Sequence, residues 1–256
     1  MSRQDDDFFV GYLSRWPATL KTFLPLVALL FIAGFAVGAI AVSATQDDPG
    51  NGAIQWGQRL TERGYIYAEP YPHLRQAPTA EHPQGRTFTM VRAGKRGVQD
   101  LATRFDGQFV EVLGVWTRRG ELEMIQAGGR QGKPAVAAVE PDYAVDALTV
   151  TEDLGRWRIA GEICDGKCYL GAMRPGRGLA HKACANLCII GGAPAVLVTA
   201  EPVEGTEFLL LADETGAPLP EGVYDLTAIL IEAEGQLERR GDLLVFKIDF
   251  DSVRRL

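Results

Sequence analysis

The residues of this chain that are best suited to chemistry lie in one short block. All four cysteines fall between Gly161 and Gly192, and the same block holds one histidine and one methionine: Cys164, Cys168, Met173, His181, Cys184 and Cys188. Thiols and imidazoles are the usual ligands of soft metal ions and the usual redox-active groups. We therefore expect any chemistry of this protein to take place in this block.

The end of the block has the composition of a short helix. The segment Leu179–Ile190 is mostly apolar and is followed by two glycines, which is typical of a helix end. At about 100° per residue, His181, Cys184 and Cys188 share one face of such a helix. The spacing therefore predicts one imidazole and two thiols on the same side.

A fourth ligand could come from the start of the block. A loop that brings Cys168 over the helix face would assemble three sulfurs and one nitrogen, a tetrahedral set that suits zinc or copper. Met173 and Cys164 would then be auxiliary soft ligands. The metal identity does not follow from these residues, and no catalytic residue or organic cofactor is indicated.

Structural disulfides are an alternative for the same cysteines. Outside the cytosol, four cysteines in a small domain usually form two bridges, each stabilising by about 2–4 kcal/mol. Pairing of Cys184 with Cys188 is the least favoured connectivity, because Cβ vectors four residues apart on a helix run side by side. A reactive thiol is a third alternative, and Lys167 next to Cys168 could support it. The spacings exclude the motifs of covalent haem, Rieske clusters and thioredoxin-type couples.

A long apolar run near the N-terminus indicates a membrane span and the compartment in which the rest of the chain lies. Residues 23–43 carry no charge and are long enough to cross ~30 Å of hydrocarbon as a helix. Arg3, Arg15 and Lys21 precede the run, whereas Asp47 and Asp48 follow it, and this bias predicts a cytoplasmic N-terminus. We expect a cytoplasmic or interfacial segment over 1–20, a transmembrane helix over 21–44 and a periplasmic C-terminal part, in a single-pass protein of the inner membrane.

Two alternatives concern this run. The tripeptide Val42-Ser-Ala44 would be an acceptable cleavage site of a signal peptide, although the apolar core of such peptides is about 7–15 residues and therefore shorter. Gly34 and Gly38 form a small-residue face through which another membrane subunit could approach, or they are ordinary glycines of a membrane helix. The aromatic-rich segment before the run predicts contact with the headgroup region.

Charge and motifs exclude several classes of function. The net charge of −7 argues against nucleic acid as a partner, because an acidic surface does not attract phosphate backbones. The chain has no phosphate-binding or dinucleotide-binding glycine pattern and no common metalloprotease or serine-hydrolase motif.

The remainder of the chain has the pattern of a mainly β protein with short helices. Two glycine-turned hairpins, around Gly120 and Gly241, share the element Arg-Arg-Gly-acid-Leu. This recurrence fits either two small barrels or the closing strands of one sandwich, and we expect two barrels of the oligonucleotide-binding (OB) type. We expect a tether and Pro-rich loop over 45–85, a first OB-like domain over 86–150 and a second, carrying the Cys/His block, over 151–256. Within the tether, Gln58–Tyr67 is predicted to be a short helix, and His73 and His82 are predicted to be solvated loop side chains.

The Cys/His block resembles a motif found in a group of exported or membrane-anchored bacterial proteins of uncharacterised activity. The likeness is firmest over 167–192, in the pattern KCYLGxMxPGxG followed by HxxCAxxCxxGG, and the segment Gly94–Gly97 is also similar. The resemblance implies that Cys168, His181, Cys184 and Cys188 form the core set and that Cys164 is an additional thiol. It implies no activity.

Together these features predict a membrane-anchored periplasmic accessory or redox-associated protein with a Cys/His metal site. A non-catalytic scaffolding or binding module, in which all four sulfurs are structural, is the alternative. A thiol enzyme would require an exposed, activated cysteine.

Overall fold

The computed structural model describes residues 20–45 and 52–256, and the chain divides into two compact units at residues 48 and 49. In the first unit, α1 (Leu20–Thr45) is one continuous helix that contains the apolar run. Its most apolar window of 18 residues has a mean hydropathy of 2.6, so α1 is long and apolar enough to cross a membrane. The interfacial segment expected before it and the first residues of the tether lie outside the described residues.

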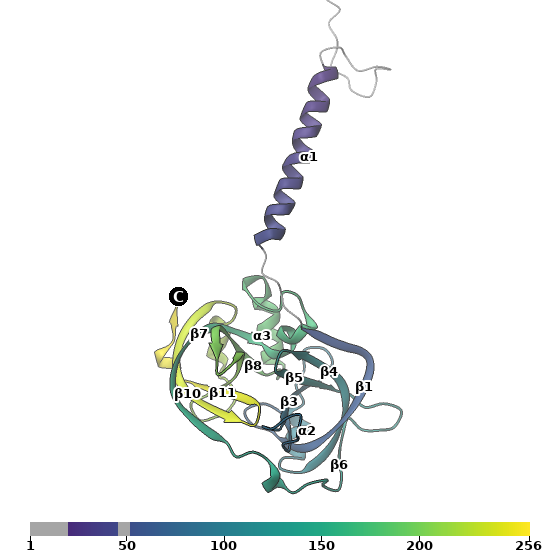
Figure 1. Ribbon diagram of the computed structural model, residues 1–256, viewed down its shortest axis with the longest axis vertical. Helices are drawn as coiled ribbons and strands as arrows, with labels where there is room; N and C mark the ends of the chain where they lie inside the picture. Colours follow the sequence, from purple (N-terminus) through teal and green to yellow (C-terminus); the bar gives the residue numbers. More distant parts are fainter. Residues whose placement is uncertain (1–19, 46–51) are drawn as a thin grey trace, which may run out of the picture. The chain divides into compact units, whose positions relative to one another are not determined.

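The second unit begins with a closed five-stranded barrel (Figure 1). Its strands are β1 (Ala53–Tyr67), β2 (His73–Gln76), β3 (Arg86–Val91), β4 (Phe109–Arg119) and β5 (Leu122–Ala127). They are ordered β1-β2-β3-β5-β4, and pairing of β1 with β4 closes the barrel. Only β3 and β5 are parallel among these five, and α2 (Gln99–Arg104) connects β3 to β4. A short strand, β6 (Val136–Ala138), adds to β4. This strand order is that of an OB-type barrel.

A second barrel repeats this topology. Its strands are β7 (Glu152–Asp165), β8 (Ala195–Val203), β9 (Thr206–Asp213), β10 (Leu230–Arg240) and β11 (Leu243–Ile248). The order is β7-β8-β9-β11-β10, with β9 and β11 parallel and β7 paired with β10. A two-residue strand, β12 (Arg254–Arg255), adds to β10. The expectation of two small OB-like barrels is confirmed.

Short helical elements connect these strands. They are η1 (Val145–Ala147) between the barrels, then η2 (Cys168–Ala172), η3 (Leu179–His181), α3 (Lys182–Ile190), η4 (Glu221–Asp225) and η5 (Phe250–Ser252). Three of them, η2, η3 and α3, lie between β7 and β8, in the connection that carries the Cys/His block. The predicted helix over Leu179–Ile190 is therefore confirmed as η3 followed by α3.

The first barrel begins earlier in the chain than the sequence pattern indicates. The predicted helix over Gln58–Tyr67 is wrong, because these residues belong to β1 and pair with β4 from Arg59 to Tyr65. Both β1 and β2 fall within the range expected to be tether and loop. The first half of β1 is largely exposed and has a register irregularity after Ile54, where Gly57 adopts a φ of +87°. An exposed, irregular strand lacks the alternation that identifies strands in a sequence.

The two barrels share apolar packing. The larger core cluster is built mainly from the second barrel, but it also includes Tyr71, Val91, Leu122 and Met124 of the first. His73 is fully buried in β2, so the expectation of a solvated imidazole at this position is wrong. Its Nδ1 lies 2.8 Å from the carbonyl oxygen of Tyr71, and burial lowers its pKa to about 4. His82, by contrast, is exposed, as expected.

Candidate thiol and histidine site

The site is built at the point where β7 ends. The backbone N–H of Gly166 donates to the carbonyl of Pro194 at 2.8 Å, which holds the end of β7 beside the start of β8. The chain then turns, and the N–H of Cys168 donates to Oδ1 of Asp165 at 2.8 Å. This local bond from a side chain to the backbone three residues on fixes the start of the connection that follows.

Three of the four sulfurs converge. The Sγ of Cys168 lies 3.8 Å from the Sγ of Cys184 and 3.8 Å from that of Cys188, and all three sulfurs lie within 4.8 Å of one another. Cys168 and Cys188 are buried, whereas Cys184 is partly exposed. All four cysteines carry free thiols. The arrangement is that of three thiols gathered around a common point, with one of them reachable from solvent.

The imidazole joins this group through a buried carboxylate. Nε2 of His181 lies 2.9 Å from Oδ2 of Asp165, and both side chains are buried. Potential ligand atoms of Asp165, Cys168 and His181 form a second group within 4.8 Å, so Cys168 belongs to both groups. An imidazole oriented by a carboxylate is the usual state of a histidine that ligates a metal. Of the four residues expected as the core set, Cys184, Cys188 and His181 thus each have a potential ligand atom within 4.8 Å of the sulfur of Cys168.

The two residues expected as auxiliary ligands lie differently. Cys164 belongs to neither group; it is buried in β7 and its thiol donates to Oε1 of Glu162 at 3.2 Å. Burial, together with the neighbouring carboxylate, raises the pKa of this thiol. Met173 is 47% exposed. Cys164 therefore lies apart from the clustered sulfurs of the same block.

A lysine from the first barrel completes the site. Nζ of Lys95 donates to Sγ of Cys184 at 2.6 Å and to Sγ of Cys188 at 3.6 Å. The hydrogen bond to Cys184 raises the pKa of Lys95. Lys167, expected to influence the neighbouring thiol, is buried and donates to the carbonyls of Arg92 and Gly94 at 2.7 Å and 2.6 Å. It therefore holds the loop that presents Lys95.

The sulfurs differ in acidity. The hydrogen bond between Cys168 and Cys188 raises the pKa of Cys168 and lowers the pKa of Cys188, so Cys188 ionises before Cys168. Burial lowers the pKa of Lys167, whereas the nearby thiols act in the opposite direction. A thiolate at Cys188 would thus be stabilised by a donor thiol on one side and an ammonium on the other.

Close backbone contact joins the two barrels at this point. The N–H of Gly97 donates to the carbonyl of Gly191 at 2.6 Å, next to the end of α3. A Cβ on Gly191 would lie 1.8 Å from the carbonyl oxygen of Lys95, and one on Gly97 would lie 2.3 Å from that of Gly192. Only glycine fits at either position, which explains why the segment containing Lys95 has a glycine at its end.

Sequence reasoning missed Lys95 and the part played by Asp165. Asp165 stands three residues before Cys168, the spacing of a side chain that caps a turn, and this signal could have been used. Lys95 lies between two glycines of the segment that resembles other proteins, but nothing in its neighbourhood indicates a contact with a cysteine 89 residues away.

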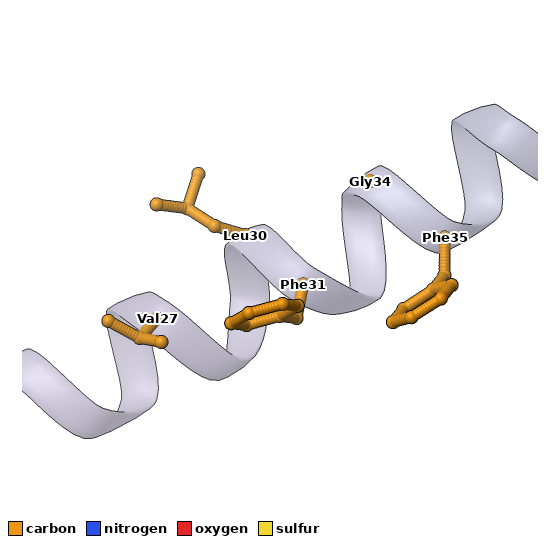
Figure 2. Close-up of a pocket in the computed structure, with 5 residues that line it drawn as sticks. All are labelled: Val27, Leu30, Phe31, Gly34 and Phe35. Carbon is orange, nitrogen blue, oxygen red and sulfur yellow. The ribbon is translucent and has the colours of Figure 1, made fainter.

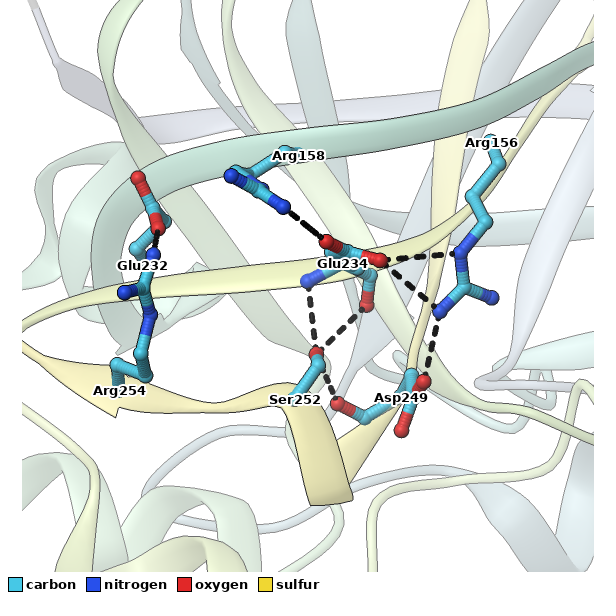
Figure 3. Close-up of polar contacts among 7 residues, drawn as sticks. All are labelled: Arg156, Arg158, Glu232, Glu234, Asp249, Ser252 and Arg254. Atoms are coloured by element: carbon cyan, nitrogen blue, oxygen red, sulfur yellow. Dashed lines mark hydrogen bonds and ion pairs between the residues drawn. The ribbon is translucent and has the colours of Figure 1, made fainter.

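A second cluster of charges on the second barrel is self-compensated. Figure 3 shows Arg156 and Arg158 paired with Glu234 across β7 and β10, and Arg156 also paired with Asp249. Arg254 pairs with Glu232 in the same cluster. Because each of these arginines has a carboxylate partner, the cluster leaves no uncompensated cationic group for a ligand.

No family model, curated protein or solved structure gives a significant match to this chain. The fold and the site therefore define its class by themselves. It is a double OB-like barrel protein with a preceding apolar helix, in which a thiol cluster and a buried Asp–His pair lie at the junction of the barrels.

Proposed function

We propose that this chain is a membrane-anchored periplasmic accessory or redox-associated protein whose second barrel binds a zinc or copper ion. The ligands are Cys168, Cys184 and Cys188, with His181 as the fourth. The observation that carries the proposal is the convergence of three thiols beside a buried, carboxylate-oriented imidazole.

The spacing of the sulfurs supports a metal site. For metal–sulfur bonds of about 2.3 Å, two sulfurs of a tetrahedral centre lie about 3.8 Å apart. The distances from Cys168 to Cys184 and to Cys188 are both 3.8 Å. Three thiolates and one imidazole favour soft or borderline ions, which excludes magnesium and calcium from this set. The ammonium of Lys95 would balance part of the negative charge of three thiolates.

The location follows from the charges around α1. Cations precede this helix and carboxylates follow it, so the barrels are proposed to lie on the periplasmic side. Protease added to spheroplasts should then digest the barrels without lysis. Protection of the barrels until lysis would place them in the cytoplasm and overturn this part of the proposal.

A membrane partner is proposed at one face of α1. Figure 2 shows Val27, Leu30, Phe31, Gly34 and Phe35 on this helix, with Gly34 leaving a gap between larger side chains. A Cβ added to Gly34 or to Gly38 would have no atom within 4 Å, so both positions leave room for another helix. Replacing both glycines with isoleucine should abolish copurification of a partner subunit. Unchanged copurification would remove this face as the contact.

Metal content tests the main proposal. The full-length chain, purified in detergent under reducing conditions, should carry one zinc or copper ion by native mass spectrometry and elemental analysis. Cys168→Ser, Cys184→Ser and Cys188→Ser should each lose it, whereas Cys164→Ser, a change at the buried thiol outside both groups, should retain it. Retention of metal in the first three variants would overturn the ligand assignment.

The alternative is a scaffold with structural disulfides. It is favoured by the same 3.8 Å separations, because a small movement would bring two of these sulfurs into a bond. However, three clustered sulfurs allow one bridge only, and Cys164 is engaged with Glu162. A metal-free wild-type chain with all four cysteines oxidised would favour the scaffold over the metal protein.

A further inference from the structure

We propose that the three clustered sulfurs are also an exchangeable dithiol couple: Cys184 attacks an incoming disulfide, and Cys168 then closes an internal Cys168–Cys184 bridge. Metal binding and this bridge use the same sulfurs, so each state excludes the other. The mutual exclusion rests on the function proposed above, whereas the exchange itself does not.

Exposure selects the sulfur that reacts first. Cys168 and Cys188 are 3% and 1% exposed, and Cys164 is 1% exposed. Cys184 is the only cysteine of the chain that is not buried. The attacking sulfur must lie in line with the S–S bond that breaks. A disulfide that arrives from solution can therefore react only with a sulfur at the surface. The ammonium of Lys95 lies 2.6 Å from the sulfur of Cys184, where it stabilises the negative charge of the attacking thiolate.

Chain geometry selects the sulfur that resolves the mixed disulfide. Cys188 lies one helical turn from Cys184 on α3, and side-by-side Cβ vectors are poorly placed for a bridge. Cys168 approaches from a different element, the start of η2, and its Sγ is already 3.8 Å from that of Cys184. A displacement of less than about 2 Å would bring these two sulfurs to bonding distance. Cys168 is therefore the resolving residue.

The exchange is balanced in two steps. In the first, the Cys184 thiolate bonds to one sulfur of a disulfide R–S–S–R, and the S–S bond of that molecule breaks to release one R–S⁻. In the second, Cys168 gives up its proton as its sulfur bonds to Cys184 Sγ, and the second R–S⁻ is released. The protons of the two protein thiols end on the two R–SH products, so the protein loses two electrons and the small disulfide gains them.

Metal and bridge cannot coexist on these sulfurs. A metal ligand must be a thiolate, and bridged sulfurs carry no such charge. The two sulfurs of a bridge also lie about 2.05 Å apart, which is shorter than the edge of a tetrahedral site. Oxidation should therefore release the metal, and bound metal should block oxidation.

The test uses the full-length chain in detergent, first reduced and stripped of metal with a chelator. Oxidised glutathione is added, the reaction is stopped by alkylation, and peptides are mapped by mass spectrometry. The wild type should carry glutathione first on Cys184 and then lose it as Cys168 and Cys184 become linked, which leaves a chain two hydrogen atoms lighter than the reduced one. Cys168→Ser should accumulate the glutathione adduct on Cys184, whereas Cys164→Ser should behave as the wild type. Glutathione on Cys188 or Cys164 before Cys184, or a final Cys184–Cys188 link, would overturn the proposal.

The wild-type time course keeps the test valid if Cys168→Ser does not fold, because the order of modification is read from the wild type alone. Preloading with Zn²⁺ should slow the exchange by roughly tenfold or more. An equal rate with zinc bound would overturn the mutual exclusion. A chain that binds neither zinc nor copper and still forms the Cys168–Cys184 link would overturn the proposed metal function and support the exchange.

Discussion

Asp165 organises the site at the scale of single residues. Its carboxylate is fully buried and is shared between the N–H of Cys168 and the imidazole of His181. Removing the imidazole would leave a buried carboxylate with one partner fewer, which lowers the free energy of unfolding. Truncation of His181 is therefore expected to destabilise the second barrel as well as to affect metal binding, and a milder change is needed to separate the two effects.

Asp165→Asn is that milder change. The amide keeps the size of the side chain and can still accept from Cys168, but it no longer orients the imidazole as an anion. We expect metal affinity to fall by about 10–100-fold with the fold retained. Competition with a chromophoric chelator measures the affinity, and circular dichroism checks the fold. Asp153→Asn, on the same strand but outside the site, is the control. Equal affinity in the two variants would exclude Asp165 as the orienting group.

Asp242 gives a prediction about pH. It lies in the turn between β10 and β11, its Oδ1 is buried without a hydrogen-bond partner, and burial raises its pKa from 3.8 to about 6. The folded state therefore holds this proton more tightly than the unfolded state. The free energy of unfolding therefore falls as pH rises from about 4 to about 6. At pH 7 it is about 3 kcal/mol lower than it would be if folding left the pKa of Asp242 unchanged.

Asp242→Asn removes that cost. We expect the variant to be more stable than the wild type at pH 7, by up to about 3 kcal/mol, and equal to it below pH 4. Urea unfolding of both proteins at a series of pH values measures the difference, in which contributions common to both, such as that of the buried His73, cancel. A stability difference independent of pH would show that the charge of Asp242 is not the cause.

The sequence predicts part of the site and misses the rest for a physical reason. Helical spacing is sufficient to place Cys184 and Cys188 on one side of α3, because it depends only on local geometry. The contact between Lys95 and Cys184 depends on how two barrels pack, and it joins residues 89 positions apart. The same holds for His73, whose burial follows from the pairing of β2 with β1 and β3.

At the scale of elements, the hairpins were predictable and β1 was not. The strands β4 and β5 are apolar-rich runs on either side of the turn at Gly120, which local patterning reveals. In β1 only the end is continuously buried, at Tyr65 and Ile66, and the chain before Arg59 is irregular. Its strand conformation is imposed by β4, a partner more than 40 residues away, and not by its own sequence.

The contact between α3 and the Arg92–Gly97 loop gives a prediction at the same scale. Gly191 has a φ of −75°, which any residue adopts, so Gly191→Ala acts only through the methyl group placed 1.8 Å from the Lys95 carbonyl. We expect the loop to be displaced, with a loss of about 1–3 kcal/mol in the free energy of unfolding and weaker protection of Cys184 from alkylation. Thermal unfolding and alkylation rates measure the two effects.

Gly222→Ala is the matched control, because a Cβ at that position has no atom within 4 Å and its φ is not positive. It should leave both quantities unchanged. If Gly191→Ala resembled this control, the barrel junction would be too loose to hold Lys95 on the thiol cluster.

At the scale of the whole molecule, the two barrels of the second unit act as one support for the site. The thiols and the Asp–His pair come from the second barrel, whereas the ammonium comes from the first. The duplicated topology predicts two separable domains, but the shared apolar cluster and the glycine contact make their junction part of the site. A change in the packing of the barrels would therefore alter the environment of Cys184 without changing any residue of the block.

The anchoring role of α1 gives the last prediction. Ile32 lies near the middle of the apolar stretch Leu20–Ala44, and a charge at the centre of a membrane helix costs about 2.5–3.5 kcal/mol during insertion. We expect Ile32→Arg to reduce the fraction of chain that resists alkaline extraction of membranes, whereas Ile32→Val should leave it unchanged. Intact mass spectrometry of the wild type should find the helix still attached. A mature chain that begins after Ala44 and is found in the soluble periplasmic fraction would instead identify the helix as a cleaved signal peptide.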